Sequence, residues 1–206
     1  YVRNNNIFYI NLKDFEEKSI TSDGKLNEII NGGTDWVYEE EFSFHKGFYW
    51  SKGSDKIAYY VFNESNVKEF QMKMYGSLYP TQHKFKYPKA GESNSEVGIK
   101  VFNLNTNRTL SFDVGNNPDI YLPRMMWSSR KDELIVFKMN RLQNHLELLS
   151  GVFSLNIPNN SGVLINKIYE EYSETYIDIH DNTYFKGEQM IWTSETDGFN
   201  HIYIIN

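Results

Sequence analysis

The fold is decided by two similar stretches, WSKGSDKIAY at residues 50–59 and WSSRKDELIV at residues 127–136. Each begins with Trp-Ser, continues through a polar segment of turn-forming residues, and ends in an apolar run of strand length. A weaker third copy, YFKGEQMIW, occupies residues 184–192. The three stretches predict a repeated unit of strand, turn and strand.

A second repeated segment predicts a third strand for each unit. It reads QNHLEL at residues 143–148 and FNHIYI at residues 199–204, and NNIFYI at residues 5–10 is similar. Repeated four-stranded antiparallel sheets of about 40 to 50 residues are typical of β-propeller blades, so about three to four blades fit here. We therefore expect an all-β fold, a partial β-propeller in which the blades form an arc. A β-sandwich of similar strand content is the alternative.

The first two Trp-Ser copies lie further apart than one blade requires. We therefore predict an insertion between strands at residues 70–95, an irregular stretch that includes Pro80 and Pro88. All of residues 1–206 are assigned to one propeller domain. Because each blade of a propeller is covered by its neighbours, we expect this arc to be a fragment of a longer protein.

Composition excludes several classes of protein. The 21 Lys and Arg residues are outnumbered by 27 Asp and Glu residues, which disfavours a sequence-independent nucleic-acid binder. No apolar run approaches the ~20 residues that span a bilayer, and the first ten residues lack a signal-peptide pattern. Cysteine is absent, so disulfides, thiolate nucleophiles and Cys-ligated zinc are excluded. The five histidines show no metal-site spacing, and we predict neither a metal nor a cofactor.

The most unusual local composition is GGTDWVYEEEF at residues 32–42, where three glutamates lie between aromatic residues. Thr34 or Asp35 can cap a short helix there, and a second brief helix is expected near residues 164–169. Two carboxylates, Glu40 and Glu41, can converge on one ammonium group. A solvated charge run is the alternative, whereas glycosidase chemistry needs carboxylates about 5 to 9.5 Å apart across a sugar, for which adjacent residues are poorly placed.

The segment at residues 35–42 resembles the signature of the dipeptidyl peptidase IV family, in its N-terminal propeller domain. Further matches follow in the family's order and cover nearly the whole chain. They are WS at residues 50–51, KIAY at 56–59, YPKAG at 87–91, YLPR at 121–124, NRLQN at 140–144 and TSETDGFNHIY at 193–203.

The resemblance implies a serine exopeptidase that removes dipeptides from free N-termini, with Pro or Ala at the penultimate position. It assigns binding of the substrate α-ammonium to Glu40 and Glu41. Glu39 is expected to support the helix. Arg141 matches a blade-turn motif, where a buried Arg that bridges strands and a substrate contact are both open. Residues 177–181, IDIHD, stand where mammalian relatives place a Phe-Arg pair that lines the pocket, so this part of the site is either altered or not aligned with the family pattern.

No catalytic residue is expected within this chain. In the family the Ser, Asp and His triad belongs to a C-terminal α/β-hydrolase domain, and no G-x-S-x-G elbow occurs here. Alone, these residues should be inactive. A prolyl tripeptidyl peptidase and a non-catalytic peptide- or protein-binding propeller are the alternative functions.

The resemblance also implies the partners and the location. The partners are peptides with a free N-terminus, the hydrolase domain of the same parent chain, and a second copy in a homodimer, to which the segment 70–95 contributes. The lack of cysteine points to a bacterial form, and bacterial relatives are usually exported, to the periplasm or cell surface.

Overall fold

The computed structural model describes residues 1–154 and 162–206, and it is all-β apart from one short helix. The chain forms two compact units. Unit 1 comprises Tyr1–Phe48 and Tyr59–Gly98, and unit 2 comprises Tyr49–Ala58 and Ile99–Asn206. Every strand pair in the described registers is antiparallel, as the predicted blades require.

Unit 1 begins with a sheet of three short strands in the order β1-β2-β3. These strands are β1 (Val2–Arg3), β2 (Asn6–Ile10) and β3 (Glu17–Ser19). Asn4 and Asn5 turn the chain between β1 and β2 with positive φ angles, a conformation that Asn tolerates better than most residues. Residues 6–10 of the predicted strand segment 5–10 form β2, and Ile7 in it is buried.

A five-stranded sheet follows, with the order β10-β9-β6-β4 and β5 paired to β6. Its strands are β4 (Ile29–Asn31), β5 (Phe48–Trp50), β6 (Lys56–Asn63), β9 (Glu96–Asn103) and β10 (Arg108–Phe112). The turn between β5 and β6 is the polar segment of the first Trp-Ser copy. Strands β6 and β9 each begin in one unit and end in the other.

The second Trp-Ser copy forms the corresponding hairpin of a sheet within unit 2. This sheet has the order β11-β13-β14-β15, with β12 paired to β13. Its strands are β11 (Ile120–Tyr121), β12 (Met125–Trp127), β13 (Glu133–Asn140), β14 (His145–Phe153) and β15 (Val163–Tyr172). Leu134, Ile135, Val136 and Phe137 of β13 are all buried, so the strand is covered on both faces and its apolar run is continuous.

The third copy forms the sheet β16-β17-β18, also in unit 2. It contains β16 (Tyr184–Lys186), β17 (Gln189–Ser194) and β18 (His201–Ile205). Trp192 of β17 is buried and packs its ring edge against Phe137. All three predicted strand–turn–strand units are therefore present.

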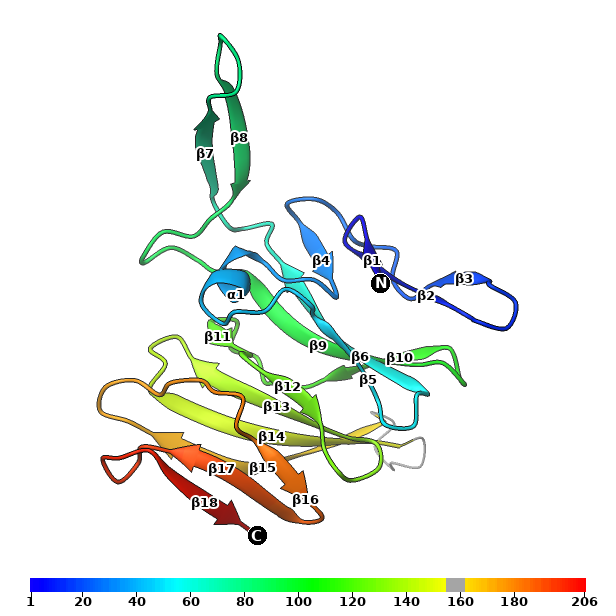
Figure 1. Ribbon diagram of the computed structural model, residues 1–206, viewed down its shortest axis with the longest axis vertical. Helices are drawn as coiled ribbons and strands as arrows, with labels where there is room; N and C mark the ends of the chain where they lie inside the picture. Colours follow the sequence, from blue (N-terminus) through cyan, green and yellow to red (C-terminus); the bar gives the residue numbers. More distant parts are fainter. Residues whose placement is uncertain (155–161) are drawn as a thin grey trace. The chain divides into compact units, whose positions relative to one another are not determined.

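Two local expectations are wrong. Residues 164–169 are part of strand β15, because backbone pairing with β14 along nine residue pairs outweighs their weak helical pattern. The stretch 70–95, interpreted as irregular, contains a regular hairpin of β7 (Glu69–Met74) and β8 (Thr81–Lys86). In Figure 1 this hairpin stands apart from the other strands of unit 1. Its status as an insertion stays a prediction.

Candidate functional site

The predicted helix is present in unit 1 as α1 (Trp36–Glu40), and Asp35 is its N-cap. The Asp35 side chain accepts a hydrogen bond from the backbone N–H of Tyr38 at 3.0 Å. Its second oxygen accepts one from the hydroxyl of Ser95 at 2.6 Å. Thr34, the other predicted cap, lies one residue earlier. The helix therefore begins at a carboxylate held on both of its oxygens.

Aromatic packing around Tyr38 anchors the helix α1 to the rest of unit 1. Tyr38 is buried, and its ring contacts those of Phe42, Phe44 and Phe62 at centroid distances of 5.1, 5.8 and 4.7 Å. Such contacts bury large apolar area and favour one orientation of the rings. The helix is short, so this packing and the cap hold it in place.

The three glutamates at the end of α1 are accessible to solvent. Glu39 is in the first turn of the helix, Glu40 is its last residue and Glu41 is its C-cap; all three are exposed. Glu40 and Glu41 form no side-chain hydrogen bond or ion pair with residues 1–154 or 162–206. Two adjacent carboxylates with open coordination can accept hydrogen bonds from an ammonium group. Their proposed role as its ligands stays a prediction.

A second buried carboxyl lies close to the start of α1. Glu64 follows strand β6 and is buried, and burial raises its pKa, with the negative charge of Asp35 adding to the effect. Burial likewise raises the pKa of Asp35, against the opposing hydrogen bonds from Ser95 and Tyr38. The base of the helix is thus a desolvated acidic environment, which no sequence pattern indicated.

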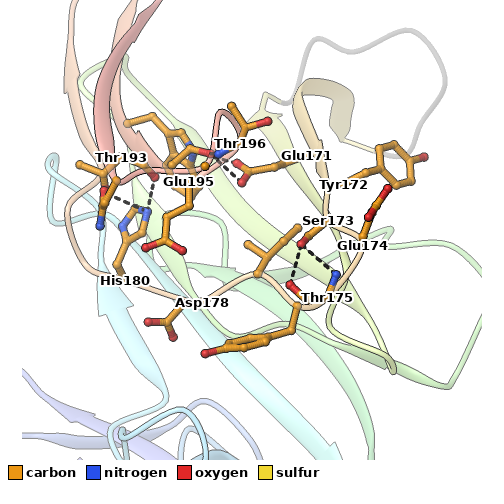
Figure 2. A pocket seen from close by; sticks show the side chains of 16 residues that line it. Glu171, Tyr172, Ser173, Glu174, Thr175, Asp178, His180, Thr193, Glu195 and Thr196 are labelled. Atoms are coloured by element: carbon orange, nitrogen blue, oxygen red, sulfur yellow. Dashed lines mark hydrogen bonds between the residues drawn. The ribbon is translucent and has the colours of Figure 1, made fainter.

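Unit 2 contains a cavity of about 530 Å³ between the segment 171–180 and strand β17 with its following turn. Figure 2 shows His180 directed toward Thr193, and carboxylates from Glu171, Glu174, Asp178 and Glu195 around the space. Among the residues that the structure describes, no Lys or Arg is part of the lining. A cavity of this composition suits a cationic or hydrogen-bond-donating group.

Two side chains of this cavity have well-defined hydrogen bonds. Glu171 is buried and accepts bonds from Ser194 at 2.7 Å, from Tyr169 at 2.8 Å and from Trp192 at 3.2 Å. The Nδ1 atom of His180 accepts from the Asn182 N–H, so its Nε2–H donates to the Thr193 carbonyl at 2.7 Å. Hydrogen bonds at both ring nitrogens therefore fix the orientation of His180, which lies in the segment 177–181.

Sequence reasoning missed a cluster of His145, Glu147 and Glu170, whose possible metal-ligating atoms lie within 4.8 Å of one another. The register of β14 and β15 brings them together, and no sequence spacing reveals that register. Lys138 lies 3.0 Å from Glu147, and Lys167 lies 2.6 Å from Glu170. Since these ammonium groups already neutralise both carboxylates, the cluster is a charge network on one sheet face.

Arg141 follows β13 in the turn to β14 and is half-buried. Its guanidinium lies 3.0 Å from Asp119 and 6.0 Å from the ring centre of Tyr121. The prediction of a strand-bridging Arg and that of a substrate contact both remain predictions.

Comparison with known proteins identifies the family. A family model described as the dipeptidyl peptidase IV (DPP IV) N-terminal region matches residues 1–206. The chain belongs to the dipeptidyl peptidase IV family. A crystal structure of Porphyromonas gingivalis dipeptidyl peptidase 4 superposes on 98% of the chain with a TM-score of 0.89 and 36% identity, over 28% of its own length. This match confirms the partial propeller as the fold of this dipeptidyl peptidase IV region.

Curated dipeptidyl peptidase relatives agree. Dipeptidyl peptidase 4 of Sus scrofa is 42% identical over 115 residues, which is 54% of this chain and 15% of that protein. Inactive dipeptidyl peptidase 10 of Rattus norvegicus is 30% identical over 185 residues, which is 86% of this chain and 22% of that protein. The chain thus spans about a fifth of the length of these relatives. Among the described residues, no helix has the length and apolar character needed to cross a membrane.

Proposed function

We propose that residues 1–206 are part of the substrate-recognition propeller of a dipeptidyl peptidase IV-like serine exopeptidase, and that Glu40 and Glu41 bind the α-ammonium of the peptide substrate. The observation that carries the proposal is the placement of two adjacent, exposed carboxylates at the end of a capped, aromatically anchored helix. The family match over the whole chain supports the reaction class.

The mechanism follows from charge. A peptide α-amino group has a pKa of about 8 and is largely protonated at neutral pH. Two carboxylates give it opposite charge and hydrogen-bond acceptors, and so hold the chain end at a set distance from the bond to be cleaved. Chains with Pro or Ala at the penultimate position then present that bond to the serine of the hydrolase domain. An N-acetylated peptide has lost the charge and should bind poorly.

The test is Glu40→Gln with Glu41→Gln in the full-length protein, assayed on Gly-Pro-p-nitroanilide. Loss of two charge-assisted hydrogen bonds should lower kcat/KM about 100-fold or more. Glu39→Gln is the matched control, since it removes an adjacent carboxylate of the same type, and most activity should remain. Wild-type kinetics in the double variant would refute the role of the pair.

Two other functions are the alternatives, and different observations would favour them. A prolyl tripeptidyl peptidase would use the same ammonium site with the scissile bond one residue further along, and faster cleavage of Ala-Ala-Pro-p-nitroanilide than of Gly-Pro-p-nitroanilide would favour it. A non-catalytic binding propeller is favoured by the relative named inactive dipeptidyl peptidase 10. A Ser elbow followed by Asp and His in the full-length sequence would exclude the latter.

We also propose a homodimer to which the β7–β8 hairpin contributes. Met72, Met74, Tyr75, Leu78 and Tyr79 are exposed on it, which is an unusual amount of apolar surface for a hairpin in water. Replacement of Tyr75, Leu78 and Tyr79 by Ser should convert a dimer to a monomer in light scattering. A monomeric wild type would refute the dimer.

The location and origin complete the proposal. Family membership and the similarity to a Porphyromonas gingivalis structure support an exported protein of bacterial origin, in the periplasm or on the cell surface. Cell fractionation with the full-length protein tests the location, and a cytoplasmic pool alone would refute it.

A further inference from the structure

The hydrogen bond between Ser95 and Asp35 joins two segments of unit 1 that lie far apart in the sequence. Ser95 immediately precedes strand β9, 60 residues after Asp35, and its hydroxyl donates to Asp35 Oδ2 at 2.6 Å. Both residues are buried, with 4% and 6% of their surface exposed. A charge-assisted hydrogen bond shielded from water is stronger than an exposed one.

Asp35 is suited to this arrangement because a carboxylate has two acceptor oxygens. One oxygen caps the helix through the Tyr38 N–H, and the other is held by Ser95. An Asn or Ser at the same position would cap the helix with a single oxygen. The structure therefore uses the residue type that can take part in both bonds at once.

The direction of α1 depends on such contacts. A helix of five residues is not stable by its own backbone hydrogen bonds. Glu40 and Glu41 lie five and six residues after Asp35, so a shift at the start of the helix changes where both carboxylates lie. Ligand groups that are 1 Å out of place lose much of their effect.

We propose that Ser95 and Asp35 are positioning residues for the ammonium site: their hydrogen bond fixes the start of α1 and thereby the positions of Glu40 and Glu41. This inference rests on the proposed function of those two glutamates. It predicts that Ser95, which is remote from the glutamates in sequence, controls the recognition of a free N-terminus.

The experiment compares Ser95→Ala with Ser95→Thr and Ser93→Ala in the full-length protein. Ser95→Ala should raise KM for Gly-Pro-p-nitroanilide about fivefold, the size of one lost side-chain hydrogen bond. Ser95→Thr keeps a hydroxyl and should recover most of the affinity. Ser93 is exposed and forms no side-chain hydrogen bond with the described residues, so its Ala variant is the matched control. The rate of labelling by a fluorophosphonate without an ammonium group should stay unchanged in all three.

A double-mutant cycle separates positioning from general damage. Asp35→Ala should lower kcat/KM about tenfold, because it removes the cap as well as the Ser95 contact. Adding Ser95→Ala to it should cause no further loss. Additive effects, a normal KM in Ser95→Ala, or an equal loss of fluorophosphonate labelling would each overturn the inference.

The outcomes also distinguish this inference from the function on which it rests. A full-length wild type that cleaves no Gly-Pro substrate, or a Glu40→Gln/Glu41→Gln variant with normal kinetics, refutes the proposed function. If that variant is impaired while Ser95→Ala is normal, only the positioning role is refuted.

Discussion

Lys56 offers a sharp test of what holds the hairpin turns of unit 2 together. Its ammonium lies 2.8 Å from Asp55 and 2.6 Å from Asp132, and its side chain is 8% exposed. We predict that Lys56→Met destabilises this region. Removing one partner of a fully buried ion pair costs about 3 to 5 kcal/mol. The side chains of Asp55 and Asp132 are 28% and 23% exposed, so water solvates part of the unpaired negative charge in the variant. We therefore expect a loss of stability of about 2 kcal/mol.

The assay is amide hydrogen exchange of the backbone of β6 and β13. A loss of about 2 kcal/mol should speed exchange about 30-fold where it follows local opening. Lys52→Met, an exposed lysine of the same turn, is the control and should change little. Adding Asp132→Asn to Lys56→Met should recover part of the loss, since it removes the repulsion between two carboxylates. Equal exchange in the two lysine variants, or no recovery, would refute the reasoning.

The pH dependence of this pair has a definite sign. Burial alone would lower the pKa of Lys56, but its hydrogen bonds to Asp132 and Asp55 outweigh burial and raise it above 10.5. The bond to Lys56 lowers the pKa of Asp55 below 3.8. The stabilisation is therefore fully present between these two ordinary values. It is lost as the pH falls through the lowered pKa of Asp55 or rises through the raised pKa of Lys56.

Two further predictions concern unit 2. Gly151→Ala should lower the melting temperature by several degrees, because a Cβ at residue 151 would lie 2.3 Å from the buried Phe112 ring. A Cβ at residue 98 meets no atom within 4 Å, so Gly98→Ala is the control and should leave the melting temperature unchanged. Equal melting temperatures of the two variants would contradict the packing argument. In Lys167→Met, the pKa of Glu170 should rise from about 2 toward 4.5 in a carboxyl NMR titration, since the ammonium of Lys167 is the main cause of the low pKa, with His145 and Tyr172 contributing. The wild-type ion pairs of Glu170 therefore persist as the pH falls below 4.5 and break as it passes about 2. An unchanged pKa in the variant would assign the low value to His145 and Tyr172.

Much of the fold was predictable because the repeats carry their own signals. Trp50 and Trp127 end the strands before two polar turns, and the apolar runs after those turns form β6 and β13. The helix was predictable from Asp35, because a capping residue followed within one turn by acidic residues is a local feature. Turns, apolar runs and helix caps depend mainly on residues that are neighbours in the sequence, so they can be predicted without knowing the tertiary contacts.

The remaining features depend on which strands become neighbours. Leu164 to Tyr169 form a strand because β14 supplies hydrogen-bond partners, and Glu171 is buried because donors from β17 surround it. The hydrogen bond between Ser95 and Asp35 likewise joins two positions 60 residues apart, and no sequence pattern links them. Glu40 and Glu41 could be selected from the sequence, but the contacts that support their helix could not.

The contacts between successive hairpin turns of unit 2 have a consequence for biosynthesis. Lys56, the first residue of β6 after the β5–β6 turn, bonds Asp132 in the β12–β13 turn, and Ser129 in the β12–β13 turn bonds the Gly187 carbonyl in the β16–β17 turn. Each turn is thus tied to the one that leaves the ribosome next. Each hairpin of a nascent chain can dock on the hairpin that formed before it, so folding can keep pace with translation. Apolar surfaces and unpaired strand edges are then exposed only briefly.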